Sequence, residues 1–310
     1  MIKKIILLIF VNFIAAITFP VGKLALCYAN PFFLTGMRMV IAGILLLLYE
    51  RFTHKKYPVF TKKFIILLLA LSFFNVFFTN CLQFWALQYT TSAKATFIFN
   101  MSPFIAAVLS YFLYGETMTI RKVVALAISF IGFFPILISD SAQFTNLKTF
   151  LFIDIAEATL FIAALTSVLG WFIMKRLLQT TQCSLVFANG ASMFLGGSLF
   201  FPLAWYTQGP HWYHVSNIPF TAFLLLLLII ANNIINYNAY AYFIKHISAT
   251  LMFLISFTGP LFALFFGWWF LGEKIGISFL ITTVIVGVGL TLYYREEKRI
   301  IKEKTFLNAP

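Results

Sequence analysis

Residues 103–116 read PFIAAVLSYFLYGE, and residues 260–273 read PLFALFFGWWFLGE. The first segment falls on the second when the sequence is shifted by 157 residues, without a gap. The shift superimposes Pro103 on Pro260, Gly115 on Gly272, Glu116 on Glu273 and Gly132 on Gly289. Self-similarity at a fixed spacing is typical of a chain built from repeated units. The sequence therefore predicts two related halves.

Polar residues repeat at the same spacing further upstream. The shift places Asn75, Thr79 and Gln83 on Asn232, Asn236 and Tyr240. Each triplet has the i, i+4, i+8 spacing of one helix face. Such stripes can line a solute path, or they can only bridge neighbouring helices. Asn233, Tyr237 and Asn238 add polarity on further faces of the second helix, which favours lining of a cavity.

The composition indicates an integral membrane protein. Hydrophobic residues make up 62% of the 310 residues and charged residues only 10%, whereas a soluble domain carries about 25% charged residues. The apolar blocks are about 20 residues long, as a membrane-spanning helix requires. We expect ten transmembrane helices, at residues 5–22, 32–49, 64–86, 92–113, 121–139, 152–174, 184–205, 221–243, 249–271 and 276–294.

The positions of the basic residues predict the orientation in the membrane. With the N-terminus in the cytoplasm, only Lys23, Lys148 and Lys274 fall in outside loops, and most of the 22 Lys and Arg residues fall inside. Because Lys and Arg concentrate in cytoplasmic loops, both termini are predicted to be cytoplasmic. The net charge of +13 thus reflects membrane topology, and it does not indicate a nucleic-acid partner.

The domain organisation follows from the repeat. Residues 1–140 form a first unit of five helices and residues 150–295 a second, and residues 296–310 are a cytoplasmic tail. Because five is an odd number, the two units must insert in opposite orientations. Inverted repeats are typical of secondary transporters, with the solute site between the halves near the bilayer midplane.

The twice-repeated pattern Pro-x11-Gly-Glu-x15-Gly resembles the tandem EamA domain of the drug/metabolite transporter superfamily. This resemblance covers nearly the whole chain. It implies an all-α fold of ten helices in two inverted five-helix repeats, with a central cavity, and transport of amino acids, other metabolites or drugs. Arg38 matches an arginine common in the family's first half. Lys94 departs from the family, which usually has a small apolar residue there.

A closer resemblance rests on residues 85–94, WALQYTTSAK, followed by Phe97 and Ser102-Pro103-Phe104. This stretch is similar to a branch of the family found in obligate intracellular bacteria. Some members of that branch carry S-adenosylmethionine. The resemblance implies a multi-pass protein of the bacterial inner membrane.

Four charged residues lie within or near predicted helices: Arg38, Lys94, Asp154 and Glu157. Lys94 either extends to the outer headgroups or faces the cavity mouth with Trp85 and Tyr89. Glu157 is the better candidate for a cavity residue, and Asp154, one turn shallower, for an interfacial one.

The remaining residues that we single out have structural roles. Arg38 is predicted to pair with helix-end carbonyl groups. Pro103 and Pro260 interrupt their helices at equivalent points, and this either frees backbone groups for a solute or only kinks the helices for packing.

We found no motif of a catalytic site, a metal site or a cofactor site. Cys27, Cys81 and Cys183 have no metal-ligand spacing. The sequence therefore predicts a non-enzymatic protein without metal or cofactor, as a monomer or homodimer in the bilayer, whose partner is a small solute. A membrane-embedded enzyme, a receptor and a channel are the weaker alternatives.

Lys94 and Glu157 would give the cavity one charge of each sign. A cation binds a carboxylate, and aromatic side chains bind ammonium-type cations. The predicted solute is thus a zwitterion, either amino-acid-like or S-adenosylmethionine-like. The alternative is an exporter of drugs or other metabolites.

Overall fold

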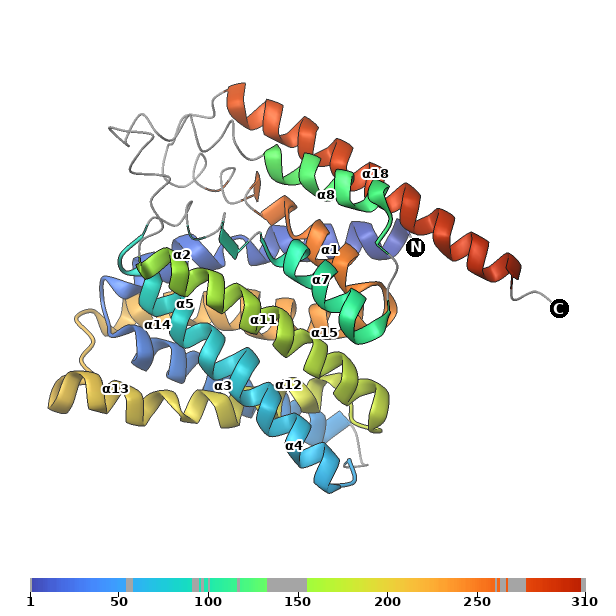
Figure 1. Ribbon diagram of the computed structural model, residues 1–310. Helices are drawn as coiled ribbons and strands as arrows, with labels where there is room; N and C mark the ends of the chain where they lie inside the picture. The colour runs from blue at the N-terminus through green and yellow to red at the C-terminus, as the bar shows by residue number, and fades with distance from the viewer. Residues whose placement is uncertain are drawn as a thin grey trace.

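The computed structural model describes residues 2–53, 58–90, 95, 98–99, 101–115, 118–132, 155–259, 261–262, 266 and 277–307. Within these ranges the chain is helical and forms no strand; one isolated β-bridge joins Ala29 to Val215. Figure 1 shows the helices packed into one bundle, with α8 and α18 side by side along one edge.

The first half of the chain contributes the following elements: α1 (Ile2–Ala15), α2 (Thr18–Leu26), α3 (Pro31–Thr53), α4 (Lys62–Leu71), η1 (Ser72–Phe78), α5 (Thr79–Leu87), α7 (Ser102–Tyr114) and α8 (Ile120–Ile131). The second half contributes α11 (Ile155–Thr180), α12 (Leu185–Ser198), α13 (Phe200–Gln208), η2 (Gly209–His211), α14 (Ile218–Leu228), η3 (Ile229–Asn236), α15 (Tyr237–His246), α16 (Ala249–Ile255) and α18 (Ile277–Leu307).

Six helical stretches in the described chain are long and apolar enough to cross a membrane. They are Lys3–Leu26, Pro31–Thr53, Lys62–Leu87, Ile155–Thr180, Leu185–His211 and Ile218–His246. Their outer faces carry apolar side chains such as Ile66 and Leu226, which are 56% and 52% exposed. Exposed apolar side chains in such numbers suit a lipid environment. The chain is therefore a multi-pass membrane protein.

Two of these stretches contain a π-helical segment at equivalent positions. The segment η1 begins at Ser72, and η3 begins 157 residues later, at Ile229. The polar residues Asn75 and Asn232 lie within them, and both are buried. π-Helical turns are rare and frequently occur at functional sites. The 157-residue shift found in the sequence therefore relates the π-helical segments of the two halves as well as their residue types.

The helix predicted at residues 5–22 is interrupted. A turn at Ala16 and Ile17 separates α1 from α2. Pro20 explains this break, because it has no N–H to donate to the carbonyl four residues earlier. The helix predicted at residues 276–294 continues instead to Leu307. There Arg299 donates to Glu296, one turn earlier, at 2.8 Å, and such i, i+3 pairs stabilise helices.

The helix predicted at residues 92–113 is broken by tight turns before Pro103. Met101 N–H donates to the carbonyl of Ile98, and Phe104 N–H donates to that of Met101. The helix α7 then begins at Ser102, with Pro103 buried in its first turn, where its missing N–H costs nothing. It ends at Gly115, whose φ of 60° suits glycine. Glu116, Pro260, Gly272 and Glu273 lie outside the described residues.

Helices with equivalent positions in the two halves contact each other. The pairs are α3 with α12 and α8 with α18, and α7 also contacts α16. At the second pair, Gly289 of α18 lies against Ser129 and the carbonyl of Ala125. A methyl group at Gly289 would overlap both, so this packing requires glycine.

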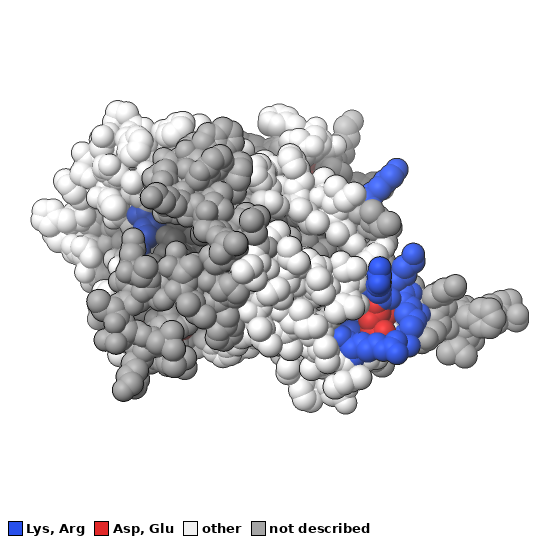
Figure 2. Space-filling model, turned by 90° about the horizontal axis from the view of Figure 1, so that it is seen from above, with Lys and Arg blue, Asp and Glu red and all other residues white. Residues whose placement is uncertain are grey.

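Basic and acidic side chains gather where α8 begins and α18 passes it (Figure 2). Glu296 forms ion pairs with Arg299 and with Arg121, at 2.8 and 3.5 Å, and accepts a hydrogen bond from Thr119. Lys122 pairs with Glu297. Both segments are basic regions that we predict to lie on the cytoplasmic side, and the structure places them together.

Candidate functional site

A buried polar network crosses the middle of the bundle. Arg38 of α3 is 1% exposed, and its Nη2 donates to Asn80 Oδ1 of α5 at 2.6 Å. The Asn80 amide in turn donates to the hydroxyl of Tyr237 in α15, at 3.3 Å. It also donates to the carbonyl of Val76 at 2.8 Å. The network therefore joins helices of both halves through side chains.

Aromatic rings continue this network toward α1. The ring of Trp171 in α11 contacts Tyr237 and Tyr240, with centroids 5.5 and 5.4 Å apart. The Tyr240 hydroxyl donates to Asn12 Oδ1 at 2.9 Å and shares a hydrogen bond of 2.7 Å with Ser256 Oγ. Tyr240, a residue predicted to face the solute, thus lies at a junction of four helical segments.

The first predicted polar stripe packs against α11. Thr79 Oγ1 lies 2.9 Å from Thr166 Oγ1. Asn75 is buried, and its side chain lies directly against Gly170. Gln83 is half-buried. The contacts of Asn75 and Thr79 are those of helix bridging, whereas Gln83 stays a candidate for solute contact.

The second stripe lies along η3 and α15. The amide of Asn236 donates to Asn232 Oδ1 at 3.0 Å. Oδ1 of Asn236 is buried and accepts no hydrogen bond within the described part of the chain. A buried polar atom without a partner is uncommon and calls for an explanation. Asn236 therefore keeps an acceptor available for a solute.

Other predicted site residues lie near helix ends that are predicted to be on the outer side. The rings of Trp85 and Tyr89 are 5.0 Å apart, and Tyr89 is 65% exposed. Glu157 is buried in the first turn of α11. Lys94 and Asp154 lie outside the described residues, so the structure does not test the predicted pairing of opposite charges.

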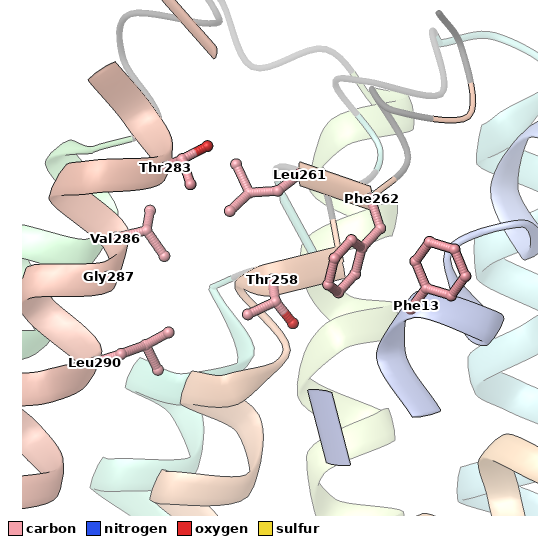
Figure 3. A pocket seen from close by; sticks show the side chains of 8 residues that line it. All are labelled: Phe13, Thr258, Leu261, Phe262, Thr283, Val286, Gly287 and Leu290. Carbon is pink, nitrogen blue, oxygen red and sulfur yellow. The ribbon is translucent and has the colours of Figure 1, made fainter. Parts of the chain in front are cut away.

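A cavity of about 440 Å³ lies beside the network, between α1 and α18 (Figure 3). It is lined by Phe13, Thr258, Leu261, Phe262, Thr283, Val286, Gly287 and Leu290. The rings of Phe13 and Phe262 meet edge to face at 5.2 Å. Only two of these residues, both threonines, carry a polar side-chain group. The described lining thus offers an apolar surface and no charge for a zwitterion.

No group of three His, Cys, Asp or Glu side chains within the described ranges could hold a metal ion. The polar groups of the network are amides, hydroxyls and one guanidinium. Such groups bind and orient a solute, and the arrangement therefore fits recognition.

Comparison with known proteins identifies the fold and the activity. The sequence profile of the EamA-like transporter family matches residues 2–138 and 154–295. The chain belongs to this family. A relative from Chlamydia muridarum is 31% identical over 299 residues, covering 95% of this chain and 92% of its own length. A second, from Chlamydia trachomatis serovar L2, is 30% identical and covers 95% and 90%. Both are named S-adenosylmethionine/S-adenosylhomocysteine transporter.

A protein of known crystal structure shares 14% sequence identity with this chain, and this likeness shows the fold alone. It covers 96% of this chain and 99% of its own, with a TM-score of 0.75. The EamA family and the Chlamydia relatives together confirm the predicted class. The protein is a multi-pass secondary transporter of a small metabolite, and not an enzyme.

Sequence reasoning missed several members of this EamA protein's central network. Asn80, Asn12 and Ser256 were not singled out, although all three are polar residues in apolar blocks. A signal for one pair was present, because the 157-residue shift places Asn80 on Tyr237. This register position lies one residue after Thr79, outside the polar stripe that begins at Asn75.

Proposed function

We propose that the protein transports S-adenosylmethionine and S-adenosylhomocysteine across the bacterial inner membrane. The observation that carries this proposal is the identity of 31% to a transporter so named, over 95% of the chain. Both solutes combine an amino-acid end with an adenine ring. Aromatic faces can hold the sulfonium and the adenine, and the Trp171, Tyr237 and Tyr240 rings supply such faces in the bundle centre.

The proposed mechanism is alternating access by two inverted five-helix repeats, residues 1–140 and 150–295. The pairing of α3 with α12 and of α8 with α18 supports this symmetry. So do the π-helical segments at equivalent positions. In such transporters the halves rock about a central site near the midplane, where we place Asn80, Tyr237, Asn236 and Tyr240.

The proposed orientation puts both termini in the cytoplasm and residues 296–310 in a cytoplasmic tail. The asymmetry of basic residues supports this orientation, and contacts between predicted loops support the grouping of the loops on each side. On the inner side, Lys175 Nζ lies 4.1 Å from the centre of the Tyr114 ring. On the outer side, Lys23 Nζ donates to the carbonyl of Thr90 at 2.7 Å, and Ser216 N–H donates to that of Tyr28.

We propose that Lys94, Glu157, Trp85, Tyr89 and Gln83 meet the solute on its way to this centre. Lys94 and Glu157 would supply opposite charges for a zwitterion near the outer opening. Asn232, in the second π-helical segment, completes the proposed polar path, and Asn75 and Thr79 bridge to α11 beside it.

The test is uptake by the purified protein in liposomes. Labelled S-adenosylmethionine should enter, and unlabelled S-adenosylhomocysteine should compete with it. Vesicles that are empty, preloaded with either compound, or under a proton gradient would identify the driving force. Uptake of simple amino acids or of cationic drugs, without uptake of S-adenosylmethionine, would refute the proposed solute and favour the corresponding alternative.

A further inference from the structure

Arg38 carries a charge in the interior of a membrane-spanning helix. Its side chain is 1% exposed, and its guanidinium lies 4.6 Å from the centre of the Phe84 ring. The ring face attracts the cation but accepts only weak hydrogen bonds. Burial of a charge is costly unless an opposite charge or full hydrogen bonding compensates it. The surroundings of Arg38 should therefore contain such a partner.

Within the described chain that partner is missing. No carboxylate there forms an ion pair with Arg38, and the acceptor on Nη2 is the neutral amide oxygen of Asn80. The donors at Nε and Nη1 are buried without any acceptor. A guanidinium has five N–H donors in a planar fork. Most of this binding capacity is unused.

The unused N–H donors of Arg38 match one kind of ligand, a carboxylate. A guanidinium binds a carboxylate through two parallel, charge-assisted hydrogen bonds. The neighbouring Tyr237 and Asn80 tie Arg38 to the network that joins the two halves. A solute bound between the halves would therefore meet this guanidinium. S-adenosylmethionine and S-adenosylhomocysteine both carry an amino-acid carboxylate.

We infer that Arg38 binds the carboxylate of the transported solute. This inference rests on the proposed function and assigns Arg38 a role beyond the structural one expected from the sequence. The donors are sealed in this structure, so the solute reaches them when the halves separate. The carboxylate then supplies the charge that compensates Arg38.

The experiment compares two competitors of labelled S-adenosylmethionine uptake in liposomes. One is S-adenosylhomocysteine, and the other is its analogue with hydrogen in place of the carboxylate. In the wild type the decarboxylated analogue should be weaker by about tenfold or more, since hydrogen bonds to charged groups carry that much affinity. In Arg38→Gln the ratio should fall to about one, because only binding of the carboxylate form weakens. Lys245→Gln removes a charge at an exposed helix end and should keep the wild-type ratio.

A second variant covers the case in which Arg38→Gln does not fold. Asn80→Asp places a carboxylate against the guanidinium, so it should compensate the buried charge and still abolish discrimination between the competitors. It loses the donation to the Val76 carbonyl, but the Tyr237 hydroxyl can donate to the new carboxylate. The inference is overturned if folded Arg38→Gln or Asn80→Asp protein keeps the wild-type ratio of the two competitors. It is also overturned if only Lys94→Gln loses that ratio. A wild type without any uptake refutes the proposed function, and the assignment of Arg38 falls with it.

Discussion

Asn80 and Tyr237 are separated by 157 residues, the spacing of the internal repeat, and a hydrogen bond of 3.3 Å joins their side chains. Equivalent positions of two repeats can touch each other only close to the axis that relates the repeats. In the proposed arrangement of inverted repeats, this hydrogen bond would mark the axis. Arg38 lies one hydrogen bond away from it.

Removal of the Tyr237 hydroxyl should weaken the junction of the halves. We expect Tyr237→Phe to fold and to lose about 1 kcal/mol of unfolding free energy, the usual net value of one hydrogen bond. Uptake should fall as well. The control is Tyr242→Phe in the same helix, since Tyr242 is 38% exposed. Thermal unfolding in detergent measures both variants, and equal transition temperatures would contradict the assigned role.

Substitution of two asparagines in the second half should distinguish a residue that contacts the solute from one that bridges helices. Asn238 accepts a hydrogen bond from Asn189 of α12 at 3.0 Å, whereas Oδ1 of Asn236 has no described partner. Asn238→Leu should cost about 1–3 kcal/mol, because it leaves a buried amide unsatisfied. Asn236→Leu also removes the donor to Asn232 Oδ1, so it should cost a similar amount of stability, but it alone should lower uptake per folded molecule. Full uptake by a folded Asn236→Leu protein would return Asn236 to a purely structural role.

The glycines of α18 allow a packing test at two nearby positions. A methyl group at Gly289 would overlap Ser129 of α8, whereas one at Gly287 would meet no atom within 4 Å. Gly289→Ala should therefore destabilise by about 1–3 kcal/mol through overpacking. Gly287→Ala should be neutral or stabilise by up to about 1 kcal/mol through helix propensity. A detergent thermal-shift assay that ranked the two in the opposite order would contradict the α8–α18 packing.

Cysteine labelling should test the orientation. His214 and Thr180 are both exposed and are predicted on opposite sides of the membrane. In a background with Cys27 and Cys81 changed to serine, His214→Cys should react with an impermeant maleimide in intact cells. Thr180→Cys should react only after permeabilisation. The reverse pattern would invert the proposed topology.

Cys183 can remain in place in that experiment. It lies in the loop between α11 and α12, where burial, and then the charge of Glu50, raise the pKa of its thiol to about 12. The thiolate is the reactive form, so Cys183 should not react at neutral pH. Labelling of the background protein itself would show that this loop opens.

Apolar blocks and repeat spacing predicted most of the fold. They identified the stretches that become α3, α11 and α12, because membrane helices must be about 20 apolar residues long. They did not predict the extension of α18 to Leu307, since charges at residues 295–299 were interpreted as the end of a helix. The helix continues there because Glu296 forms ion pairs with Arg299 in the same segment and with Arg121 of α8.

The site was harder to predict because a sequence does not fix how helices rotate about their axes. Arg38 was expected to pair with helix-end carbonyls, and its partners are the Asn80 side chain and the Phe84 ring. The stripe at Asn75 was recognised as polar, but its contact with Gly170 depends on the position of α11. Lys94, on which the predicted charge pairing depends, stays a prediction.

The length of α18 has a practical consequence. At 1.5 Å per residue, its 31 residues form a rod of about 46 Å, whereas the hydrocarbon core of a bilayer is about 30 Å thick. Since α18 is predicted to cross the bilayer, roughly a third of the rod would project from the membrane. A fluorescent protein fused to the C-terminus would stand on a stiff stalk, clear of the lipid headgroups, and could report on tilting of this helix during a transport cycle.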